Sequence, residues 1–263
     1  MTTLSIVIPV FNKHHLTDRC LDSLLQHSSS PHQITIIDNN STDETPTILN
    51  EWKKKFEAAR WIFNIVVNEK NVGFGRAMNQ GAKLSSGEYL CLLNNDTWLL
   101  PNWDLNLSKA LDTHPELQLV FPYIDETHPF DKATLIQKGT RFEQKNRERQ
   151  RHTFTGVLMF FRKSAFDQLQ GFDERFFVCY EDTDLRVRMD KEDLKYRMVG
   201  SCFIWHHSMG TRSDTKNIVS TYEQESRAKF FEKWGFNFSD VEKTLQARWE
   251  RRWTRFKNRF GYL

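Results

Sequence analysis

Acidic side chains stand at three well-separated places in this chain where they could act on one substrate. Asp38 follows the apolar run 34–37, Asp96 follows the run 88–93, and Glu181 and Asp182 follow the aromatic run 176–180. A carboxylate can bind a divalent cation, accept hydrogen bonds from a nucleoside, or take a proton from a hydroxyl group. Each position also has an ordinary structural explanation, so the local context of each one matters.

Asp96 closes the tripeptide Asn94-Asn95-Asp96. Its oxygen ligands are suited to a hard divalent cation that bridges two phosphates and neutralises charge on a departing diphosphate. An imidazole from His206 or His207 could complete such a site. The alternatives are a simple turn, because Asn and Asp favour turns, and histidines with a structural role only.

Asp38 could accept hydrogen bonds from a base or a ribose, as acidic residues at strand ends do in other nucleotide-binding folds. The alternative is a cap for the helix that follows, a task for which Ser41 and Asp43 compete. In the loop 71–79, the glycines at positions 73 and 75 allow the backbone to approach a ligand, and a helix N-terminus follows. This loop matches neither a dinucleotide-binding nor a Walker pattern.

The segment 171–188 gives the strongest local signal. Glu181, Asp182 and Asp184 are three acids within four residues, which is costly unless a cationic or reactive group faces them. Asp182 could act as the general base toward a hydroxyl group. Asp184 and Arg188 stand one helical turn apart and should form an ion pair. The alternative for Glu181 and Asp182 is a charge pair at a helix N-terminus.

Alternating strands and helices must position these residues. The pattern predicts strands at 5–10, 34–37, 63–67 and 88–93, and helices at 16–27, 45–60 and from the 71–75 loop to about Leu84. Such alternation, with unalternating apolar strands, predicts an α/β fold with a mainly parallel sheet and helices on both faces. The carboxyl ends of those strands would bring Asn12, Asp38 and Asp96 to one rim.

The second half is less regular. Residues 127–152 hold no clear period and are rich in Lys and Arg, which predicts a long loop or an extended hairpin. Ser164 is expected to cap a short helix that ends at Leu169, residues 182–190 read as a helix, and 195–199 and 202–205 read as short strands.

In their order, seven segments between about Leu4 and Thr211 resemble glycosyltransferase family 2, a family of inverting enzymes with a GT-A fold, and in particular bacterial surface-glycan rhamnosyl- and hexosyltransferases. They are SIVIPVFN, IDNNSTDET, NVGFGRAMNQG, LLNND, TGVLMFF, GFDERFFVCYEDTDLRVR and WHHSMGT. The resemblance implies transfer of a sugar from a UDP- or dTDP-sugar to a hydroxyl of a glycan or lipid-linked acceptor. It also implies Mg²⁺ or Mn²⁺ as cofactor, and a place in bacterial cell-surface polysaccharide synthesis.

The same resemblance implies roles for individual residues. Asp182 would be the catalytic base, with Glu181 beside it contacting the acceptor. Asp96 would bind the metal. His206 matches the family's late histidine, which contacts the metal or the diphosphate, with His207 as the alternative. The residues implied in nucleotide-sugar binding are Pro9, Asn12, Asp38, Asn71, Gly73, Asn79, Asn94, Asn95 and Gly156.

The tripeptide 94–96 has one acid where many family members have two or three. The donor's phosphates would then supply much of the coordination, and metal affinity without donor should be poor. The sequence 246–249 resembles the QxxRW signature of processive synthases but misses its spacing by one residue. A processive polymerase is therefore not expected.

Residues 1–240 read as the GT-A domain and 241–263 as a separate basic aromatic helix. Residues 243–263 carry seven Lys or Arg and one Glu, a net charge of +6. Leu245, Trp249, Trp253, Phe256 and Phe260 would share one face, with arginines on much of the rest, which is typical of a helix on an anionic membrane surface. The alternative is a helix packed on its own domain or on a second copy in a homodimer.

Composition narrows the remaining classes. The chain has 263 residues, 39% of them hydrophobic, so it can bury a large core and is not disordered. The four cysteines form no CxxC pair and the N-terminus reads as a strand, which predicts a cytoplasmic protein, with peripheral attachment to the membrane as an option. A net charge of +3 does not call for nucleic acid.

Two rival functions fit the sequence less well. A nucleotidyltransferase that makes nucleotide sugars would need a Gly- and Lys/Arg-rich signature beside the first strand, where only Lys13 stands. A nucleic-acid-binding module could use the basic tail and the stretch 138–151, but it leaves the clustered acids unexplained.

Overall fold

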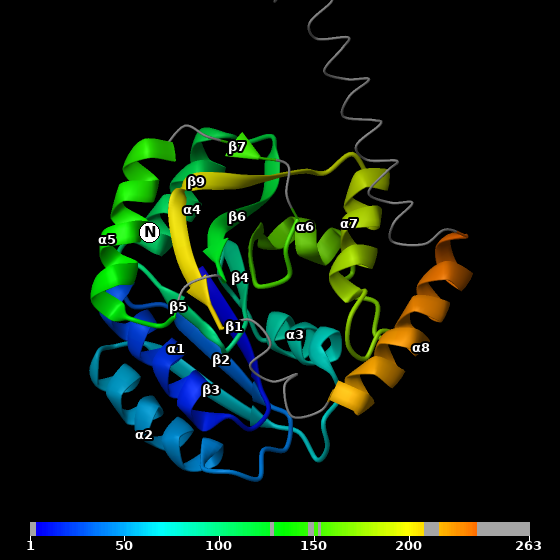
Figure 1. The fold of residues 1–263 in the computed structure, drawn as a ribbon, viewed down its shortest axis with the longest axis horizontal. Coiled ribbons are helices and arrows are strands. Elements are labelled where there is room, and N and C mark those ends of the chain that lie inside the picture. The colour runs from blue at the N-terminus through cyan, green and yellow to red at the C-terminus, as the bar shows by residue number, and fades with distance from the viewer. Residues whose placement is uncertain (1–3, 127–128, 147–149, 152–153, 208–215, 236–263) are drawn as a thin grey trace, which may run out of the picture.

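The computed structural model describes residues 4–126, 129–146, 150–151, 154–207 and 216–235 (Figure 1). Within these residues, nine strands form one sheet in the order β3-β2-β1-β4-β8-β6-β9-β5, with β7 paired to β9. The strands are β1 (Leu4–Val10), β2 (Gln33–Asp38), β3 (Ile62–Val67), β4 (Tyr89–Leu93), β5 (Thr97–Leu99), β6 (Leu117–Asp125), β7 (Gln150–Arg151), β8 (Leu158–Arg162) and β9 (Lys195–His206).

The helices cover both faces of this sheet (Figure 1). They are α1 (His14–His27), α2 (Thr45–Ala58), α3 (Phe74–Lys83), α4 (Trp103–Thr113), α5 (Lys132–Asn146), α6 (Lys163–Gln168), α7 (Glu181–Lys191) and α8 (Lys216–Trp234). No helix in the described part of the chain is long and apolar enough to cross a membrane.

Strands β3, β2, β1 and β4 are parallel neighbours, as the sequence predicts. Val10 pairs with Asp38, and Val7 pairs with Leu92. The strand β4 then pairs with β8 in the antiparallel direction, and β8 also pairs with β6 in the antiparallel direction. The carboxyl ends of β1, β2 and β4 therefore meet at one edge, where Asp38 and the turn 94–96 lie.

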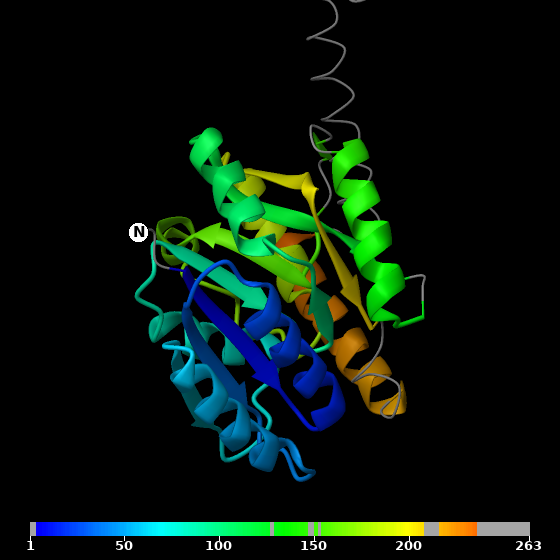
Figure 2. The ribbon, with the colours of Figure 1, turned by 90° about the vertical axis from the view of Figure 1, so that its left-hand side faces the viewer.

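Alternate residues of each central strand supply two separate cores. Ile6 and Ile8 of β1 pack into the core shared with α1, α2 and α4, whereas Val7 packs into the core shared with α3, α6 and α7. Burial of both faces explains why these strands show apolar runs without polar alternation. Figure 2 shows the first layer from outside, with α1 and α2 in front of the strands.

Three expectations for the second half were wrong. Residues 132–146 form the helix α5 where a loop or hairpin was expected, although the short β7 follows it. The helix α5 packs close to the sheet at Gly139, where an added Cβ would lie 2.0 Å from Cδ2 of Leu100. Residues 195–206 form one continuous strand rather than two. The helix α6 begins at Lys163, so Ser164 lies inside its first turn and does not cap it.

A buried carboxylate joins the loop after α1 to the first turn of α4. Asp104 is 2% exposed and accepts hydrogen bonds from the backbone N–H of Ser29 at 2.9 Å and from its hydroxyl at 2.6 Å. Nε2 of His32 lies 2.8 Å from the same carboxylate oxygen. Burial raises the pKa of Asp104, but the hydrogen bonds from His32 and Ser29 outweigh it and lower the pKa overall.

Replacing Asp104 with Asn should therefore destabilise the fold. We expect a loss of about 2 kcal/mol in the free energy of unfolding at pH 7, because buried donors lose a charged acceptor. The pKa of Asp104 is lower in the folded chain, so its stabilisation is present above the unfolded pKa and disappears as pH falls through the folded pKa. Urea unfolding of both proteins from pH 7 to pH 3 should show the difference shrink in acid. Asp167→Asn, a change at an exposed residue, serves as control. An equal loss in the free energy of unfolding there would contradict the stabilising role of Asp104.

Candidate functional site

The predicted residues at the ends of β1 and β2 build one turn. The side-chain oxygen of Asn12 accepts a hydrogen bond from the backbone N–H of Thr42 at 2.7 Å, and Asn12 has a left-handed backbone with φ 53°. Oδ1 of Asp38 accepts from the backbone N–H of Ser41 at 2.9 Å, and Asp38 is 1% exposed. Asp38 thus shapes the turn after β2. Pro9 lies beside it on β1, in register with Ile37.

The start of α2 uses a different acid. Oδ1 of Asp43 accepts from the backbone N–H of Thr45 at 3.0 Å, so Asp38 does not cap this helix. Burial raises the pKa of Asp43, but hydrogen bonds from Thr45 and His14 outweigh it and lower the pKa to about 2. The N-cap residue of α2 is Glu44, whose side chain makes no capping hydrogen bond, and Asp43 supports the first turn through Thr45.

The loop before α3 rests on the segment that leads into α7. Gly73 has φ +85°, and a Cβ there would lie 2.4 Å from the backbone oxygen of Phe177. The side-chain oxygen of Asn71 accepts from the backbone N–H of Gly73 at 2.9 Å. Only glycine permits both this backbone conformation and this approach. The loop is also tied to the turn after β2, because Oδ1 of Asn39 accepts from the backbone N–H of Val72 at 3.5 Å.

Asn79 has a supporting position in this arrangement. Its amide donates to the backbone oxygen of Phe172 at 2.9 Å and accepts from the backbone N–H of the same residue at 2.8 Å. The side chain is buried, at 7% exposed. These bonds hold the turn 171–174 against α3, so the amide is engaged with protein and does not point to a ligand.

Asp96 and His206 meet at the end of the sheet. Thr97 pairs with His206 across β5 and β9, and Nε2 of His206 lies 3.1 Å from Oδ1 of Asp96. This carboxylate oxygen is buried and has no other hydrogen-bond donor among the described residues. The next residue, His207, donates its backbone N–H to the backbone oxygen of Asp96 at 2.8 Å. Of the two histidines, His206 is the one whose ring reaches the Asp96 carboxylate.

Glu126, which the sequence reasoning missed, contacts the other side of that ring. Its Oε1 lies 2.6 Å from Nδ1 of His206. Burial lowers the pKa of His206, but its contacts with Asp96 and Glu126 outweigh burial and raise the pKa. A carboxylate behind a histidine fixes the ring orientation and its tautomer, as in many metal sites. In the described part of the chain, no three His, Cys, Asp or Glu side chains form a closed metal cage.

The two asparagines before Asp96 have different surroundings. The amide of Asn95 donates to Oγ1 of Thr17 at 2.9 Å and is buried. The side-chain oxygen of Asn94 is also buried, and no described residue donates to it. Asn95 therefore anchors the turn, and Asn94 retains an oxygen for a ligand.

Asp182 lies in the first turn of α7, and this helix begins directly after two residues with left-handed backbones, Cys179 and Tyr180. Its Oδ1 accepts from the backbone N–H of Thr183 at 2.7 Å. Its Oδ2 lies 3.1 Å from where a Cβ on Gly156 would stand, so a side chain there would crowd the carboxylate. The neighbour of Gly156, Val157, accepts a hydrogen bond from the backbone N–H of Asn94 at 3.0 Å.

The helix α8, which the sequence also did not predict, contacts the first turn of α7. Asp184 is fully buried and accepts from Nε of Arg188 at 2.8 Å, which confirms the predicted pair. Its other oxygen accepts from Nε1 of Trp234 at 2.9 Å and contacts Nζ of Lys233 at 2.5 Å. The start of α7 is thus fixed by buried ionic and aromatic contacts.

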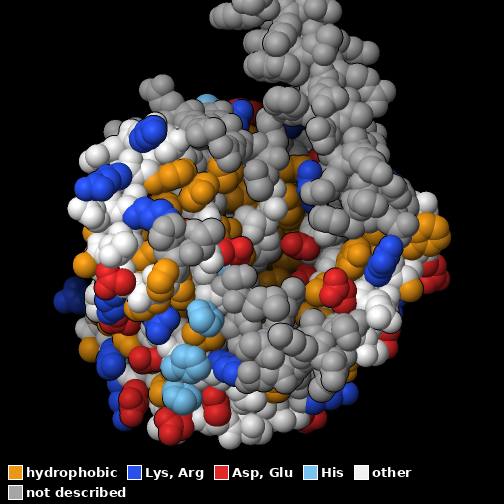
Figure 3. All heavy atoms as spheres, viewed as in Figure 1, with side chains coloured by type: hydrophobic (Ala, Val, Ile, Leu, Met, Phe, Trp, Pro, Cys, Tyr) orange, Lys and Arg blue, Asp and Glu red, His pale blue; other side chains and the backbone are white. Residues whose placement is uncertain are grey.

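These contacts join the predicted positions into one rim. The turn after β2 holds the 71–73 loop, this loop rests on Phe177, and the helix α7 that follows places Asp182 beside Gly156. The strand ladder then places Gly156 next to the turn 94–96. Figure 3 shows acidic side chains gathered in the hollow at the centre of this face. These contacts connect the segments that carry the predicted positions, and Asn79 and Asn95 act as supports within them.

Comparison with protein families and curated relatives gives a consistent result. The family model described as glycosyl transferase family 2 matches residues 5–170. The O-antigen biosynthesis protein RfbC of Myxococcus xanthus is 28% identical over 232 residues, which cover 80% of this chain and 18% of the relative. Poly(ribitol-phosphate) beta-glucosyltransferase of Bacillus spizizenii is 38% identical over 101 residues, which cover 36% of this chain and 15% of the relative. The chain therefore spans less than a fifth of the length of both.

Solved structures share the fold. A mannosyltransferase from Pyrobaculum calidifontis, in complex with GDP-Man and Mn²⁺, matches with a TM-score of 0.66 at 16% identity, over 88% of this chain and 64% of its own. TarS of S. aureus, residues 1–349, matches with a TM-score of 0.60 at 14% identity, over 86% and 68%. These matches confirm the predicted GT-A fold.

Proposed function

The chain belongs to glycosyl transferase family 2, and we propose that it moves a sugar from a nucleotide diphosphate donor to a hydroxyl of a glycan or lipid-linked glycan, with inversion. As a glycosyltransferase it needs a donor site, a means to stabilise the leaving diphosphate, and a base for the acceptor. One observation carries this proposal. Asp182 lies beside Gly156, Val157 is hydrogen-bonded to the turn 94–96, and Asp96 of that turn contacts His206.

The side chains at the end of β4 fit a divalent cation. Oδ1 of Asp96 is buried without another donor, Nε2 of His206 is its neighbour, and Glu126 orients the ring. We assign Asp96 and His206 as the protein ligands of Mg²⁺ or Mn²⁺, with Asn94 close by. When bound, the cation would neutralise negative charge that develops on the leaving diphosphate. Two protein ligands leave most of the coordination to the donor's phosphates.

Asp182 is assigned as the base that takes the proton from the acceptor hydroxyl. Its Oδ1 accepts from the backbone N–H of Thr183, and its Oδ2 lies close to Gly156. The left-handed residues before α7 and the buried Asp184 contacts behind it fix that orientation. Glu181 precedes it in the same turn and is assigned to the acceptor. Attack from the side opposite the diphosphate gives inversion.

The donor's nucleoside is assigned to the turn after β2 and to the loop before α3. Pro9, Asn12 and Asp38 would frame the base, and Asn71 and Gly73 would approach the ribose and phosphates with backbone groups. Asn79 is assigned to positioning, because its amide holds Phe172. Residues 243–263, the proposed membrane-binding or dimerising helix, lie outside the described residues.

The names of two relatives support a role in surface polysaccharide synthesis, since one is an O-antigen biosynthesis protein and one acts on poly(ribitol-phosphate). Donor hydrolysis across UDP-, dTDP- and GDP-sugars with Mn²⁺ is the direct test. We expect hydrolysis of one nucleotide class, its loss on chelation, and its return when Mn²⁺ is added. The anomeric configuration of a transfer product, read by NMR, should be opposite to that of the donor. Retention of configuration would reject the proposed displacement.

A further inference from the structure

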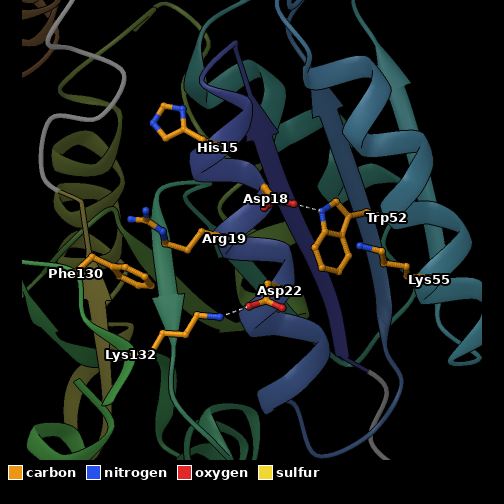
Figure 4. A pocket seen from close by; sticks show the side chains of 8 residues that line it. All are labelled: His15, Asp18, Arg19, Asp22, Trp52, Lys55, Phe130 and Lys132. Carbon is orange, nitrogen blue, oxygen red and sulfur yellow. Dashed lines mark hydrogen bonds and ion pairs between the residues drawn. The ribbon is translucent and has the colours of Figure 1, made fainter. Parts of the chain in front are cut away.

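A groove of about 530 Å³ crosses the outer face of α1 (Figure 4). Helix α1 forms its floor, α2 forms one wall, and the chain that leads into α5 forms the other. Its lining residues are His15, Asp18, Arg19, Asp22, Trp52, Lys55, Phe130 and Lys132. Sites for small ligands in proteins have volumes of roughly 300–1,000 Å³, so this groove can hold one or more units of a longer molecule.

One wall of the groove borders the proposed metal ligands. The ring of Phe130 contacts the ring of Trp205, with centroids 5.0 Å apart, and Trp205 immediately precedes His206 on β9. The guanidinium of Arg19 lies 5.7 Å from the centroid of the same Trp205 ring. The groove thus adjoins the end of β9, the strand that also carries His206.

The carboxylates of the groove already have partners. Asp18 accepts from Nε1 of Trp52 at 2.8 Å, and Asp22 accepts from Nζ of Lys132 at 2.7 Å. Arg19 differs from them, because within the described residues its guanidinium makes no hydrogen bond or ion pair. It lies 3.8 Å over the ring of Phe130. In Figure 4 it extends from α1 toward Phe130 on the same side of the groove as His15.

Burial and neighbouring groups change the pKa values of both Arg19 and His15. Burial lowers the pKa of Arg19, with Asp18 opposing it. Burial also lowers the pKa of His15, and the neighbouring groups His14, Arg19, Lys13 and His207 add to this effect. A guanidinium that is partly withdrawn from water, and whose donors have no acceptor among the described residues, is well suited to bind an oxyanion.

We propose that this groove binds an acidic acceptor, whose phosphate or carboxylate group is held by Arg19 with His15 beside it. The proposal rests on the assigned transferase function and names the acceptor class. The donor is expected outside the groove, where the loop before α3 meets the segment before α7. The helix α1 packs into the opposite core from α3 and α7. Because α7 also carries Asp182, an acceptor held in the groove must be long enough to extend past the end of the sheet to that residue.

Calorimetric binding to the full chain tests this with three probes: a glycerol phosphate oligomer, tetragalacturonate and neutral chitotetraose. We expect one of the two acidic probes to bind and chitotetraose to bind far more weakly. Arg19→Met, which keeps the apolar stem over Phe130, should weaken that binding by about tenfold to a hundredfold. Arg19→Lys should restore much of it, because the charge returns. Lys54→Gln, an equal charge change on α2 outside the groove, should bind as the wild type does.

The acidic-acceptor site would be overturned by equal binding of all three probes, or by Arg19→Met binding as tightly as the wild type. Failure of both acidic probes to bind has the same meaning. Donor hydrolysis by the wild type is measured in parallel. If hydrolysis is absent while the acidic probe binds and depends on Arg19, the transferase assignment fails and the anion site stands.

Discussion

Asp182→Asn should lower kcat by two to four orders of magnitude, the usual contribution of a positioned general base. The amide has nearly the same shape and its oxygen can still accept from the backbone N–H of Thr183, so the start of α7 should keep its structure. It cannot accept a proton from the acceptor hydroxyl. The affinity for the nucleotide diphosphate should change little, because Asp182 is assigned to the acceptor side. Single-turnover transfer and nucleotide binding, measured on the same protein, separate the two effects.

The matched control is Asp167→Asn, an exposed acid whose partner is Lys163. It should leave both quantities unchanged. If Asp182→Asn transfers sugar at a rate near that of the wild type, the base must be sought elsewhere, and Glu181 is the next candidate. If binding of the nucleotide is lost together with turnover, Asp182 belongs to the donor site instead.

The elements from β1 to β4 could be predicted from the sequence because most of them are buried in a regular way, whereas β5, α4 and β6 were not predicted. Strand β1 sends Ile6 and Ile8 to one core and Val7 to the other, so its sequence is continuously apolar. The helix α5 escaped prediction because few of its residues are buried, namely Leu135, Gly139 and Asn146. A helix that buries so narrow a stripe shows too few apolar residues for a period of 3.6 to stand out.

The candidate site also contains residues that could be predicted from the sequence and one that could not. Asp38 and Asp96 were predicted from their positions after apolar runs, and Asp182 from its acidic cluster after an aromatic run. Contacts connect the segments that carry them, and their common site stays a prediction. Glu126 was missed, although it follows the apolar run of β6 just as Asp96 follows that of β4. Its partner His206 is 80 residues away, and the side chain of Glu126 is 46% exposed. Only the pairing of β6 with β9 brings the two together.

Asn79 illustrates the opposite difficulty. Its motif indicated a ligand contact, but its amide has the shape to bond both backbone groups of Phe172. The turn it binds begins at Gly171, where an added Cβ would lie 2.3 Å from the side-chain oxygen of Asn79. Sequence alone does not separate a side chain that contacts a ligand from one that holds the loop beside it.

Asp96→Asn should have the largest effect on the metal-dependent step. Removing a ligand charge beside a diphosphate costs several kcal/mol of stabilisation as charge develops on the leaving group, which corresponds to roughly a thousandfold in rate. Glu126→Gln gives a graded comparison, because the loss of a residue that orients a metal-bound histidine typically costs 10- to 100-fold. Both variants keep the size of the original side chain. The buried position of Asp96 and the contact of Glu126 with one ring nitrogen predict this order of effects.

Rates measured over a range of Mn²⁺ concentrations distinguish a metal role from a structural one. For Glu126→Gln, the Mn²⁺ concentration that gives half-maximal rate should rise, and saturating Mn²⁺ should recover much of the activity. For Asp96→Asn, little should be recovered, because the neutral amide is a poor ligand and leaves only His206 on the protein side. Mn²⁺ should bind the wild type weakly without nucleotide and more tightly with it, since the phosphates complete the coordination. An Asp96→Asn protein with normal activity and an unchanged Mn²⁺ dependence would place the cation elsewhere, and the contact between Asp96 and His206 would then be an ordinary buried ion pair.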